Sequence, residues 1–271
     1  MLQERIELVE QQNYEAATKL REAGLKPCVA IINANIEDEP SQRYIRNKIK
    51  KLEENGIATE LIQIGKGGTL GDIVESIHRC NYDSTITSII LQLPLADKFK
   101  KWEKKLIEMI ESEKDIDRLR SEWYYCDSFT DLPLTAEGMY RTLLGVEGIG
   151  NKKILFYGNG VTTNRRLYLF LFNAGFGDCR IINSKTPTKS KNELIEWADV
   201  IVAATGIPES LACEGKIVIS PTIAKTEDGF RSDLIHKLRD KNEVHNVIGG
   251  IGKLTVSTLV RRSYTDCTEG L

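Results

Sequence analysis

Short apolar runs alternate with helical segments along most of the chain, and this alternation constrains the fold more than any other feature of the sequence. The apolar runs are bounded by Gly, Pro or polar residues, as is typical of buried strands, while the segments between them have helical periodicity. The predicted strands are 28–33, 58–64, 87–95, 153–158, 179–183, 200–206 and 216–220. The predicted helices are 1–24, 41–55, the segment after Gly67-Gly68, 98–111, 134–146, 165–175, 193–198 and 254–264. This order predicts βαβ units and parallel sheets, and therefore an α/β fold.

Length and charge narrow the class of protein. The chain has 271 residues, enough for about two domains at roughly 150 residues each. The formal net charge is −2 and no basic tract is present, which argues against a nucleic-acid partner. We expect neither a signal peptide nor a membrane span, and no metal site, because the six cysteines and three histidines lack zinc-site spacing. We therefore predict a cytoplasmic protein with reduced thiols.

Tyr44 and Lys48 are the first candidate functional residues. They are four positions apart in the predicted helix 41–55, so the phenol and the ammonium project from one face. A Tyr–Lys pair can hold a substrate ring and move a proton, provided that burial or a nearby cation lowers the pKa of the lysine. The alternative is a solvated basic face, since Arg43, Arg46, Lys50 and Lys51 are also present.

Polar residues near the carboxyl end of the strand 87–95 form a second candidate group. Gln92 interrupts an apolar run, and an unpaired buried amide costs about 1–3 kcal/mol, so it needs partners. Asp115 and Asp117 follow the next helix and could bind the paired N–H groups of a guanidine-like ring. The alternatives are a satisfied core amide and solvated carboxylates.

Glycine-rich turns form the third group. After the strand 153–158 the chain reads Gly158-Asn159-Gly160 and enters a helix, which is the context of a dinucleotide-binding turn or of an ordinary βα turn. Ser184 and Lys185 follow the next strand where NAD enzymes often carry an acidic residue, and they suit a 2′-phosphate better, which favours NADP over NAD. The segment 249–252, Gly-Gly-Ile-Gly, is either a flexible start of the last helix or a ligand wall.

Seven segments in this order resemble the bifunctional methylenetetrahydrofolate dehydrogenase/methenyltetrahydrofolate cyclohydrolase family, from about Pro27 to Thr255. The family's YxxxKxK matches Tyr44, Lys48 and Lys50, and its QLPL matches residues 92–95. Its KDVDG, PCTPxG, HSKT, GxP and GGVGPMT resemble residues 114–118, 133–138, 183–186, 206–208 and 249–255. The nucleotide side departs from the family, because Asn159 replaces an arginine of the family's GRSxxVGxP and Ser220-Pro221-Thr222 replaces its DVG. In KDVDG, Arg118 replaces the glycine.

The resemblance implies a two-domain enzyme with a cleft between a catalytic domain and a Rossmann-type domain. The implied folate-binding domain comprises residues 1–122, with the helix 254–271 returning to it, and the implied NAD(P)-binding domain comprises residues 134–246. Lys48 would be the acid/base, positioned by Gln92, while Tyr44 would stack on the p-aminobenzoyl ring and Asp117 would hold the pterin. The implied substrate contacts also include Gly249, Gly250 and Gly252. The implied cofactor contacts are Gly158, Asn159, Gly160, Ser184, Lys185, Thr205 and Gly206.

The implied reactions are the NADP-linked oxidation of 5,10-methylenetetrahydrofolate and the hydrolysis of the methenyl product to 10-formyltetrahydrofolate, in a homodimer. Three alternatives remain at this point. The chain could be a cyclohydrolase with weak or NAD-linked dehydrogenase activity, a shikimate-dehydrogenase-like oxidoreductase, or a non-catalytic folate- or nucleotide-binding relative.

Overall fold

The structure, a computed structural model, divides into two compact units. It describes residues 2–125, 127–204, 215–220, 224–226, 229–231, 243–246 and 251–269. One unit comprises Gln11–Trp123 and Val256–Leu271, and we call it the small-sheet unit. The other comprises Met1–Glu10 and Tyr124–Thr255, and we call it the large-sheet unit. The helices α1 (Leu2–Glu22) and α9 (Ile251–Glu269) contribute residues to both units.

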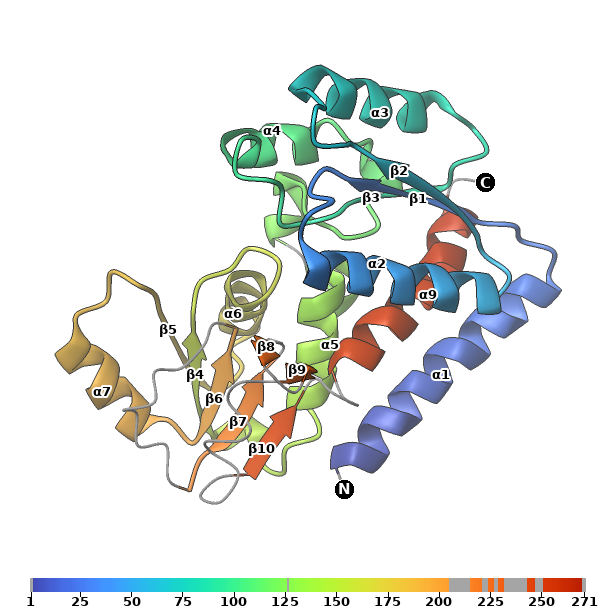
Figure 1. Ribbon diagram of the computed structural model, residues 1–271. Coiled ribbons are helices and arrows are strands. Elements are labelled where there is room, and N and C mark those ends of the chain that lie inside the picture. The colour runs from blue at the N-terminus through green and yellow to red at the C-terminus, as the bar shows by residue number, and fades with distance from the viewer. Residues whose placement is uncertain are drawn as a thin grey trace. The chain divides into compact units, whose positions relative to one another are not determined.

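The small-sheet unit is built on three parallel strands in the order β2-β1-β3. These strands are β1 (Cys28–Asn33), β2 (Ala58–Gln63) and β3 (Ser88–Leu91). The helices are α2 (Glu39–Glu54), α3 (Leu70–Tyr82) and α4 (Glu103–Glu108), the last preceded by the 3₁₀ helix η1 (Lys100–Trp102). The helices α3 and α4 cover one face of the sheet, while α2 and α9 lie on the other (Figure 1). Because β1 is central, with β2 on one side and β3 on the other, the carboxyl ends of β1 and β3 flank a topological switch point.

Local sequence signals explain where the helices of this unit begin. The Asp38 carboxylate accepts a hydrogen bond from the Ser41 amide at 2.9 Å and caps α2, and Pro40 occupies the first turn. Thr69 and Asp72 form a capping box at the start of α3. At the other end of α2, the Tyr264 hydroxyl of α9 donates to the Asn55 carbonyl at 2.7 Å. These contacts fix α2, which carries two of the candidate residues.

Lys114 fastens the end of α3 to the segment that follows α4. Its Nζ donates to the carbonyls of Cys80, Asn81 and Asp83 at 2.7–2.8 Å, where the last carbonyls of the helix lack partners within it. We expect Lys114→Met to lower the free energy of unfolding by about 2 kcal/mol, because these are hydrogen bonds from a charged donor. Chemical denaturation monitored by circular dichroism measures this change. The exposed Lys104→Met is the matched control, and an equal loss in both variants would contradict the assignment.

The large-sheet unit contains five parallel strands in the order β10-β7-β6-β4-β5. They are β4 (Lys153–Tyr157), β5 (Asp178–Ile182), β6 (Val200–Ala203), β7 (Ile217–Ser220) and β10 (Glu243–Asn246). The helices α5 (Leu134–Leu143) and α6 (Asn164–Asn173) pack against one face of the sheet, and α7 (Thr188–Trp197) packs against the other (Figure 1). A short antiparallel pair, β8 (Ala224–Thr226) and β9 (Gly229–Arg231), completes the described strands.

Further 3₁₀ helices are η2 (Ser112–Lys114), η3 (Ser121–Tyr125), η4 (Phe129–Asp131) and η5 (Ile149–Asn151).

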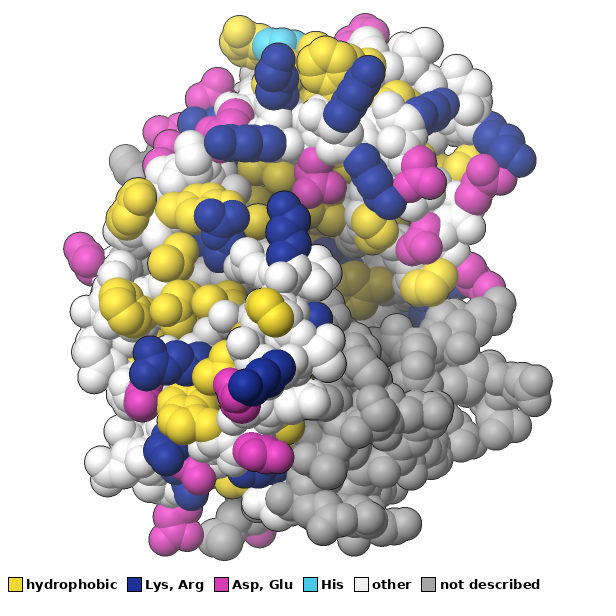
Figure 2. Space-filling view, turned by 90° about the vertical axis from the view of Figure 1, so that its left-hand side faces the viewer, with side chains coloured by type: hydrophobic (Ala, Val, Ile, Leu, Met, Phe, Trp, Pro, Cys, Tyr) yellow, Lys and Arg dark blue, Asp and Glu magenta, His cyan; other side chains and the backbone are white. Residues whose placement is uncertain are grey.

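The prediction of an α/β fold with parallel sheets is confirmed, and some boundaries differ. The predicted helix 98–111 contains only η1 and the short α4, because the backbone forms i→i+3 hydrogen bonds on both sides of α4, from Trp102 to Phe99 and from Met109 to Leu106. The last helix is longer than predicted, and β10 was not predicted. None of the helices that the structure describes is long and apolar enough to cross a membrane. On the face drawn in Figure 2, basic and acidic side chains are interspersed, in keeping with the net charge of −2.

Candidate functional site

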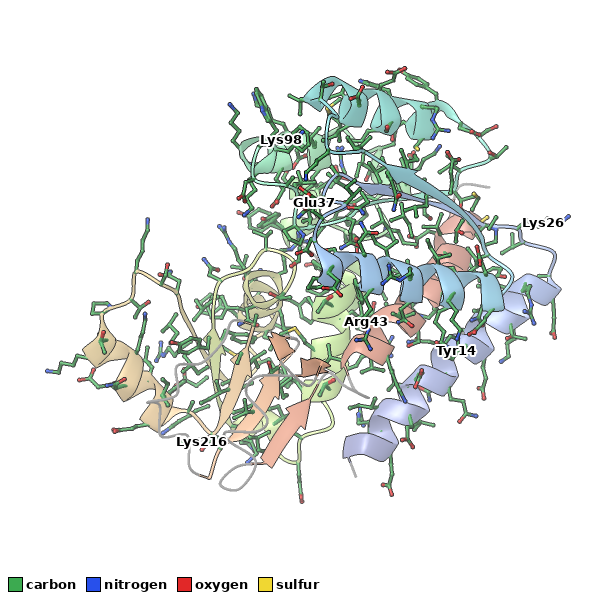
Figure 3. The ribbon with its side chains drawn as sticks, viewed as in Figure 1. Tyr14, Lys26, Glu37, Arg43, Lys98 and Lys216 are labelled. Carbon is green, nitrogen blue, oxygen red and sulfur yellow. The ribbon has the colours of Figure 1, made fainter. Side chains whose placement is uncertain are left out.

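The side chain of Lys48 lies inside the small-sheet unit. It projects from the third turn of α2 and is only 3% exposed. Its Nζ lies 4.7 Å from the centroid of the Tyr44 ring, one helical turn earlier, as the four-residue spacing predicts. Arg43, Arg46 and Lys50 on the same helix are exposed, and Figure 3 labels Arg43 on α2. The interpretation of this segment as a solvated basic face therefore fits its neighbours but not Lys48.

Gln92 supplies the hydrogen-bond partner of Lys48. Gln92 directly follows β3, and its backbone amide donates to the Ile32 carbonyl of β1 at 2.9 Å. Its side-chain Nε2 donates to the Leu93 carbonyl at 2.6 Å, which turns Oε1 toward Lys48, whose Nζ donates to it at 3.2 Å. Gln92 is thus a buried amide with partners on both sides, and it contacts the candidate catalytic residue directly.

Burial lowers the pKa of Lys48 from the ordinary lysine value, because removal from water disfavours the ammonium form. The Asp117 carboxylate acts in the opposite direction and raises the pKa of Lys48. The neutral Gln92 oxygen accepts a hydrogen bond from the ammonium but adds no charge. This lysine can therefore lose its proton more readily than an exposed one, as general base catalysis requires.

The segment Asp115–Arg118 is a tight turn beside β3. Asp115 forms a parallel bridge with Ile89, and the Arg118 amide donates to the Asp115 carbonyl at 3.0 Å. The buried Asp115 carboxylate accepts hydrogen bonds from the Leu119 and Arg120 amides at 2.8 and 2.9 Å. Burial nevertheless raises the pKa of Asp115 to about 6. Asp115 therefore shapes the turn, while Asp117, which is half-buried, is the carboxylate that acts on Lys48.

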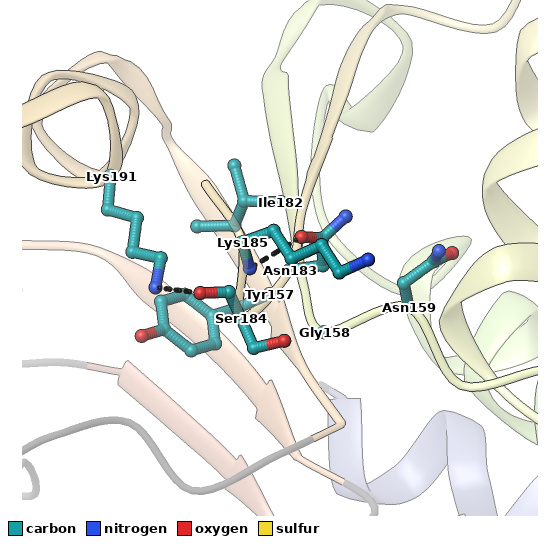
Figure 4. A pocket seen from close by; sticks show the side chains of 8 residues that line it. All are labelled: Tyr157, Gly158, Asn159, Ile182, Asn183, Ser184, Lys185 and Lys191. Carbon is teal, nitrogen blue, oxygen red and sulfur yellow. Dashed lines mark hydrogen bonds between the residues drawn. The ribbon is translucent and has the colours of Figure 1, made fainter. Parts of the chain in front are cut away.

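A second site is a pocket of about 630 Å³ at the carboxyl ends of β4 and β5 in the large-sheet unit (Figure 4). Its lining comprises Tyr157, Gly158, Asn159, Ile182, Asn183, Ser184, Lys185 and Lys191. The side chains of Lys185 and Lys191 bring two ammonium groups to it from different elements. Lys191 lies on α7, and its Nζ donates to the Ser184 carbonyl at 3.4 Å. The pocket can therefore take an anionic ligand.

The turn between β4 and α6 contains two glycines, and the backbone conformation requires glycine at the first of them. Gly158 has φ 102°, which only glycine adopts readily, and a Cβ at Gly160 would lie 2.9 Å from the Thr163 hydroxyl. The buried Asn164 side chain holds the turn, because its Nδ2 donates to the carbonyls of Tyr157, Gly158 and Val202 at 2.9–3.2 Å. No side chain caps the start of α6, although the Arg165 amide of its first turn donates to the Gly160 carbonyl at 3.0 Å. The positive end of the helix dipole at this turn favours an anionic ligand.

The structure brings some predicted site residues together and does not describe others. Tyr44, Lys48 and Gln92 are in contact, and Asp117 acts on Lys48 through its charge. Gly158, Asn159, Ser184 and Lys185 line the pocket, and Gly160 belongs to the same turn. Gly252 lies in the first turn of α9. Thr205, Gly206, Gly249 and Gly250 lie outside the described residues.

Sequence reasoning missed the parts played by Lys191 and Asn164. Lys191 is one of several charged residues in a polar helix, and only the pocket distinguishes it. Asn164 directly precedes the predicted helix 165–175 and is not among the predicted site residues. A buried position for an asparagine at the start of an apolar helix is the signal that could have revealed it.

Comparisons with known proteins identify the family. The family model described as tetrahydrofolate dehydrogenase/cyclohydrolase, catalytic domain, matches residues 3–117. The bifunctional protein FolD of Pelagibacter ubique (strain HTCC1062) is 30% identical over 242 residues, which cover 84% of this chain and 83% of that protein. This chain belongs to the FolD family.

Solved structures of the FolD family share the fold. The crystal structure of the FolD methylenetetrahydrofolate dehydrogenase/cyclohydrolase from Campylobacter jejuni has a TM-score of 0.83 and is 25% identical, covering 97% of this chain and 95% of that one. The Trypanosoma brucei FolD, complexed with NADP cofactor and inhibitor, has a TM-score of 0.81 and is 24% identical, covering 98% of this chain and 95% of that one. These FolD neighbours support the two-domain fold class with a Rossmann-like nucleotide-binding domain. The residues matched by the FolD catalytic-domain model include Tyr44, Lys48, Gln92 and Asp117, whereas the departures at Arg118 and Asn159 lie beyond them.

Proposed function

We propose that this chain oxidises 5,10-methylenetetrahydrofolate to the methenyl form with NADP⁺ and hydrolyses that product to 10-formyltetrahydrofolate. The buried Lys48, whose Nζ donates to Gln92 Oε1 at 3.2 Å beside the Tyr44 ring, carries the proposal. A lysine held in this way serves proton transfer, which a protein that only binds folate does not need. Membership in the FolD family favours this function over that of a shikimate-dehydrogenase-like oxidoreductase.

In the proposed mechanism, the residues of the small-sheet unit bind and orient the folate. Tyr44 stacks on the p-aminobenzoyl ring, and the Asp117 carboxylate accepts hydrogen bonds from the pterin. Lys48 in its neutral form accepts a proton from the water that attacks the methenyl carbon. The ammonium so formed returns this proton to N5 as the bond between the carbon and N5 breaks, and the hydroxyl on the carbon loses its proton to solvent, which gives the 10-formyl product. Gln92 holds the Lys48 amine in position for both steps. Lys48 must be neutral for part of the cycle, which is consistent with the lowered pKa.

The pocket of the large-sheet unit fits a phosphorylated dinucleotide. The uncapped first turn of α6 and the glycines of the preceding turn suit a pyrophosphate, and Ser184, Lys185 and Lys191 suit a 2′-phosphate. These residues would hold a dinucleotide, whose nicotinamide would supply hydride-acceptor chemistry for the oxidation. We propose that Thr205 and Gly206 also contact the cofactor, and that Gly249, Gly250 and Gly252 contact the substrate, as the family resemblance implies.

We expect the double variant Lys185→Ala/Lys191→Ala to bind NADP about 30-fold more weakly and to bind NAD almost unchanged, because each ammonium contributes a charge-assisted hydrogen bond to a 2′-phosphate. Calorimetric titration with 2′,5′-ADP measures the loss of affinity for the 2′-phosphate without turnover. Lys189→Ala is the matched control, since Lys189 lies on the same helix, is exposed and does not line the pocket. Equal loss of NAD and NADP affinity would argue against this specificity role.

A turnover assay tests the proposed function. The protein is mixed with 5,10-methylenetetrahydrofolate and either NADP⁺ or NAD⁺, and nicotinamide reduction is followed. Decay of the methenyl absorbance is followed separately. We expect both reactions, with NADP⁺ preferred. Folate binding without either reaction would support the non-catalytic alternative and contradict the proposal.

One second candidate has a specific observation in its favour. Asn159, in place of the family's arginine, lines the pocket and brings no positive charge to it. Hydrolysis of the methenyl form with weak or NAD-linked dehydrogenase activity would then be the outcome of the assay. Lys191 supports the NADP-linked reading, because it restores a cation to the pocket.

The family resemblance supports three further proposals about organisation. We propose that residues 1–122, with 254–271, form the folate-binding domain and that residues 134–246 form the nucleotide-binding domain. We also propose that the protein is a cytoplasmic homodimer. Light scattering after size exclusion tests the oligomeric state, and a monomer at micromolar concentration would contradict it.

A further inference from the structure

Arg118 occupies a backbone conformation that disfavours a side chain. Its φ is 53°, in the left-handed region where glycine is preferred, and the similar segment of the FolD family has glycine at this position. A residue in such a conformation persists when its surroundings hold it there. The contacts of the Arg118 side chain therefore call for a functional explanation.

The Arg118 guanidinium links three segments of the small-sheet unit. Its Nη2 pairs with the Asp266 carboxylate of α9 at 3.0 Å, and the two side chains are only 8% and 6% exposed. Its Nη1 donates to the Asp115 carbonyl at 3.0 Å, and the guanidinium carbon lies 4.5 Å from the centroid of the Trp123 ring. The fixed fork geometry of arginine allows these contacts at the same time.

These contacts hold the turn that carries Asp117. The Asp115 carbonyl accepts from both the backbone amide and the side chain of Arg118. The Ile116 carbonyl accepts from Nη1 of Arg262, also on α9, at 3.2 Å. The peptide groups that precede Asp117 are thus fastened to α9 by two guanidinium groups. Asp117 itself is the charge in the turn that acts on Lys48.

We propose that Arg118 and Asp266 are positioning residues that fix the Asp117 carboxylate for the pterin and set its distance from Lys48. This inference rests on the proposed function, because it assigns the turn to that substrate. Neither residue is proposed to touch the substrate. Their effect passes through the peptide backbone of residues 115–118.

Three variants separate positioning from a merely structural role. Arg118→Lys keeps the charge, but a lysine lacks the fork with which arginine both donates to the Asp115 carbonyl and pairs with Asp266. Asp266→Asn removes the carboxylate from a residue on a different element. The double variant Arg118→Gly/Asp266→Asn removes both charges of the ion pair and restores the residue that φ 53° favours, so it avoids the uncompensated charge that either single variant leaves in this pair. Arg79→Gln, which removes an exposed ion pair with Glu60 in the same unit, is the control.

We expect each variant to raise KM for the methenyl substrate about tenfold while kcat changes less than threefold. The contact between Asp117 and the pterin is made equally in the bound substrate and in the transition state, so weakening it affects mainly KM. The pH profile provides the second readout. If Asp117 moves away from Lys48, the pKa of Lys48 falls further, and the rising limb of the rate shifts to lower pH. The groups that face Lys48 are Tyr44 of α2, Gln92 after β3 and Asp117 of the turn, and the titration of Asp115, near pH 6, is followed separately with Asp115→Asn.

The result that overturns the inference is a fall in thermal stability with KM and the pH profile unchanged. Calorimetric titration with 5-formyltetrahydrofolate distinguishes this failure from failure of the proposed function. If the unsubstituted protein turns over the substrate and the variants match it, only the positioning role is wrong. If the unsubstituted protein neither turns over nor binds the folate, both proposals are wrong.

Discussion

Lys48→Met is expected to lower the rate of methenyltetrahydrofolate hydrolysis by about 10³-fold, within the range that general acid–base catalysis contributes. Methionine has nearly the length of the lysine stem and no ionisable group, so it fills the same buried space beside Tyr44 and Gln92. Affinity for the folate should change only a few-fold, because the stacking ring and the Asp117 carboxylate remain. Decay of the methenyl absorbance measures the rate, and calorimetry measures the affinity.

Lys50→Met is the matched control for this prediction. Lys50 lies on the same helix, its side chain is 70% exposed, and it pairs with the exposed Glu54 at 3.8 Å. The control should keep at least half of the activity. Hydrolysis that survives in Lys48→Met would contradict the catalytic assignment, and equal loss in both variants would point to a general effect of charge.

The pH dependence follows from the direction of the Lys48 shift. The neutral amine is the proposed base, so the rate should rise as pH increases through the lowered pKa of Lys48. The free energy of unfolding also rises with pH. Between the folded and the unfolded pKa the unfolded state binds more protons at Lys48, so the free energy of unfolding rises with pH across that window. Lys48→Met should lack this rise and should be no less stable than the unsubstituted protein near pH 7. A variant that loses activity because it unfolds would not show this behaviour.

Local sequence signals predicted that Lys48 lies beside Tyr44, because the geometry of a single helix creates this contact. The four-residue spacing of Tyr44 and Lys48 places them on one helix face wherever that helix packs. Gln92 was noticeable because an amide inside an apolar strand requires a partner, and that partner is Lys48. The same reasoning could not show which lysine of α2 is buried, since burial depends on the sheet beneath the helix.

The features that sequence reasoning missed depend on contacts between distant segments. Lys114 was matched only as part of a motif, but its ammonium caps α3 more than thirty residues earlier in the chain. Arg118 counted as a departure from the family's glycine, and its partner Asp266 is in the last helix. No local pattern predicts such pairs, because each residue looks like an ordinary surface charge until the fold places its partner beside it.

Asn164→Ala is expected to weaken NADP binding about 100-fold and to leave methenyl hydrolysis nearly unchanged. The Asn164 amide holds the carbonyls of Tyr157 and Gly158, in the turn that follows β4, and that of Val202 in β6. Loss of this donor removes hydrogen bonds from the Gly158 and Val202 carbonyls, at a cost of about 1–3 kcal/mol in all, whereas the Tyr157 carbonyl still accepts from the Ala204 amide at 3.1 Å. The first turn of α6 then no longer lies where a pyrophosphate would meet its amides.

In this test, NADP binding reports on the large-sheet unit and methenyl hydrolysis reports on the small-sheet unit. NADP affinity is measured by titration, and KM for NADP⁺ is measured in the dehydrogenase assay. Hydrolysis of the methenyl form reports on Lys48 of the small-sheet unit. Asn173→Ala, which changes the exposed asparagine at the other end of the same helix, is the control and should alter neither activity. If Asn164→Ala lowers both activities in parallel, the nucleotide turn is not an independent site, and the assignment of one reaction partner to each unit is wrong. If it lowers only the affinity for NADP, each unit holds its own reactant, and the rearrangement of the turn accounts for the loss.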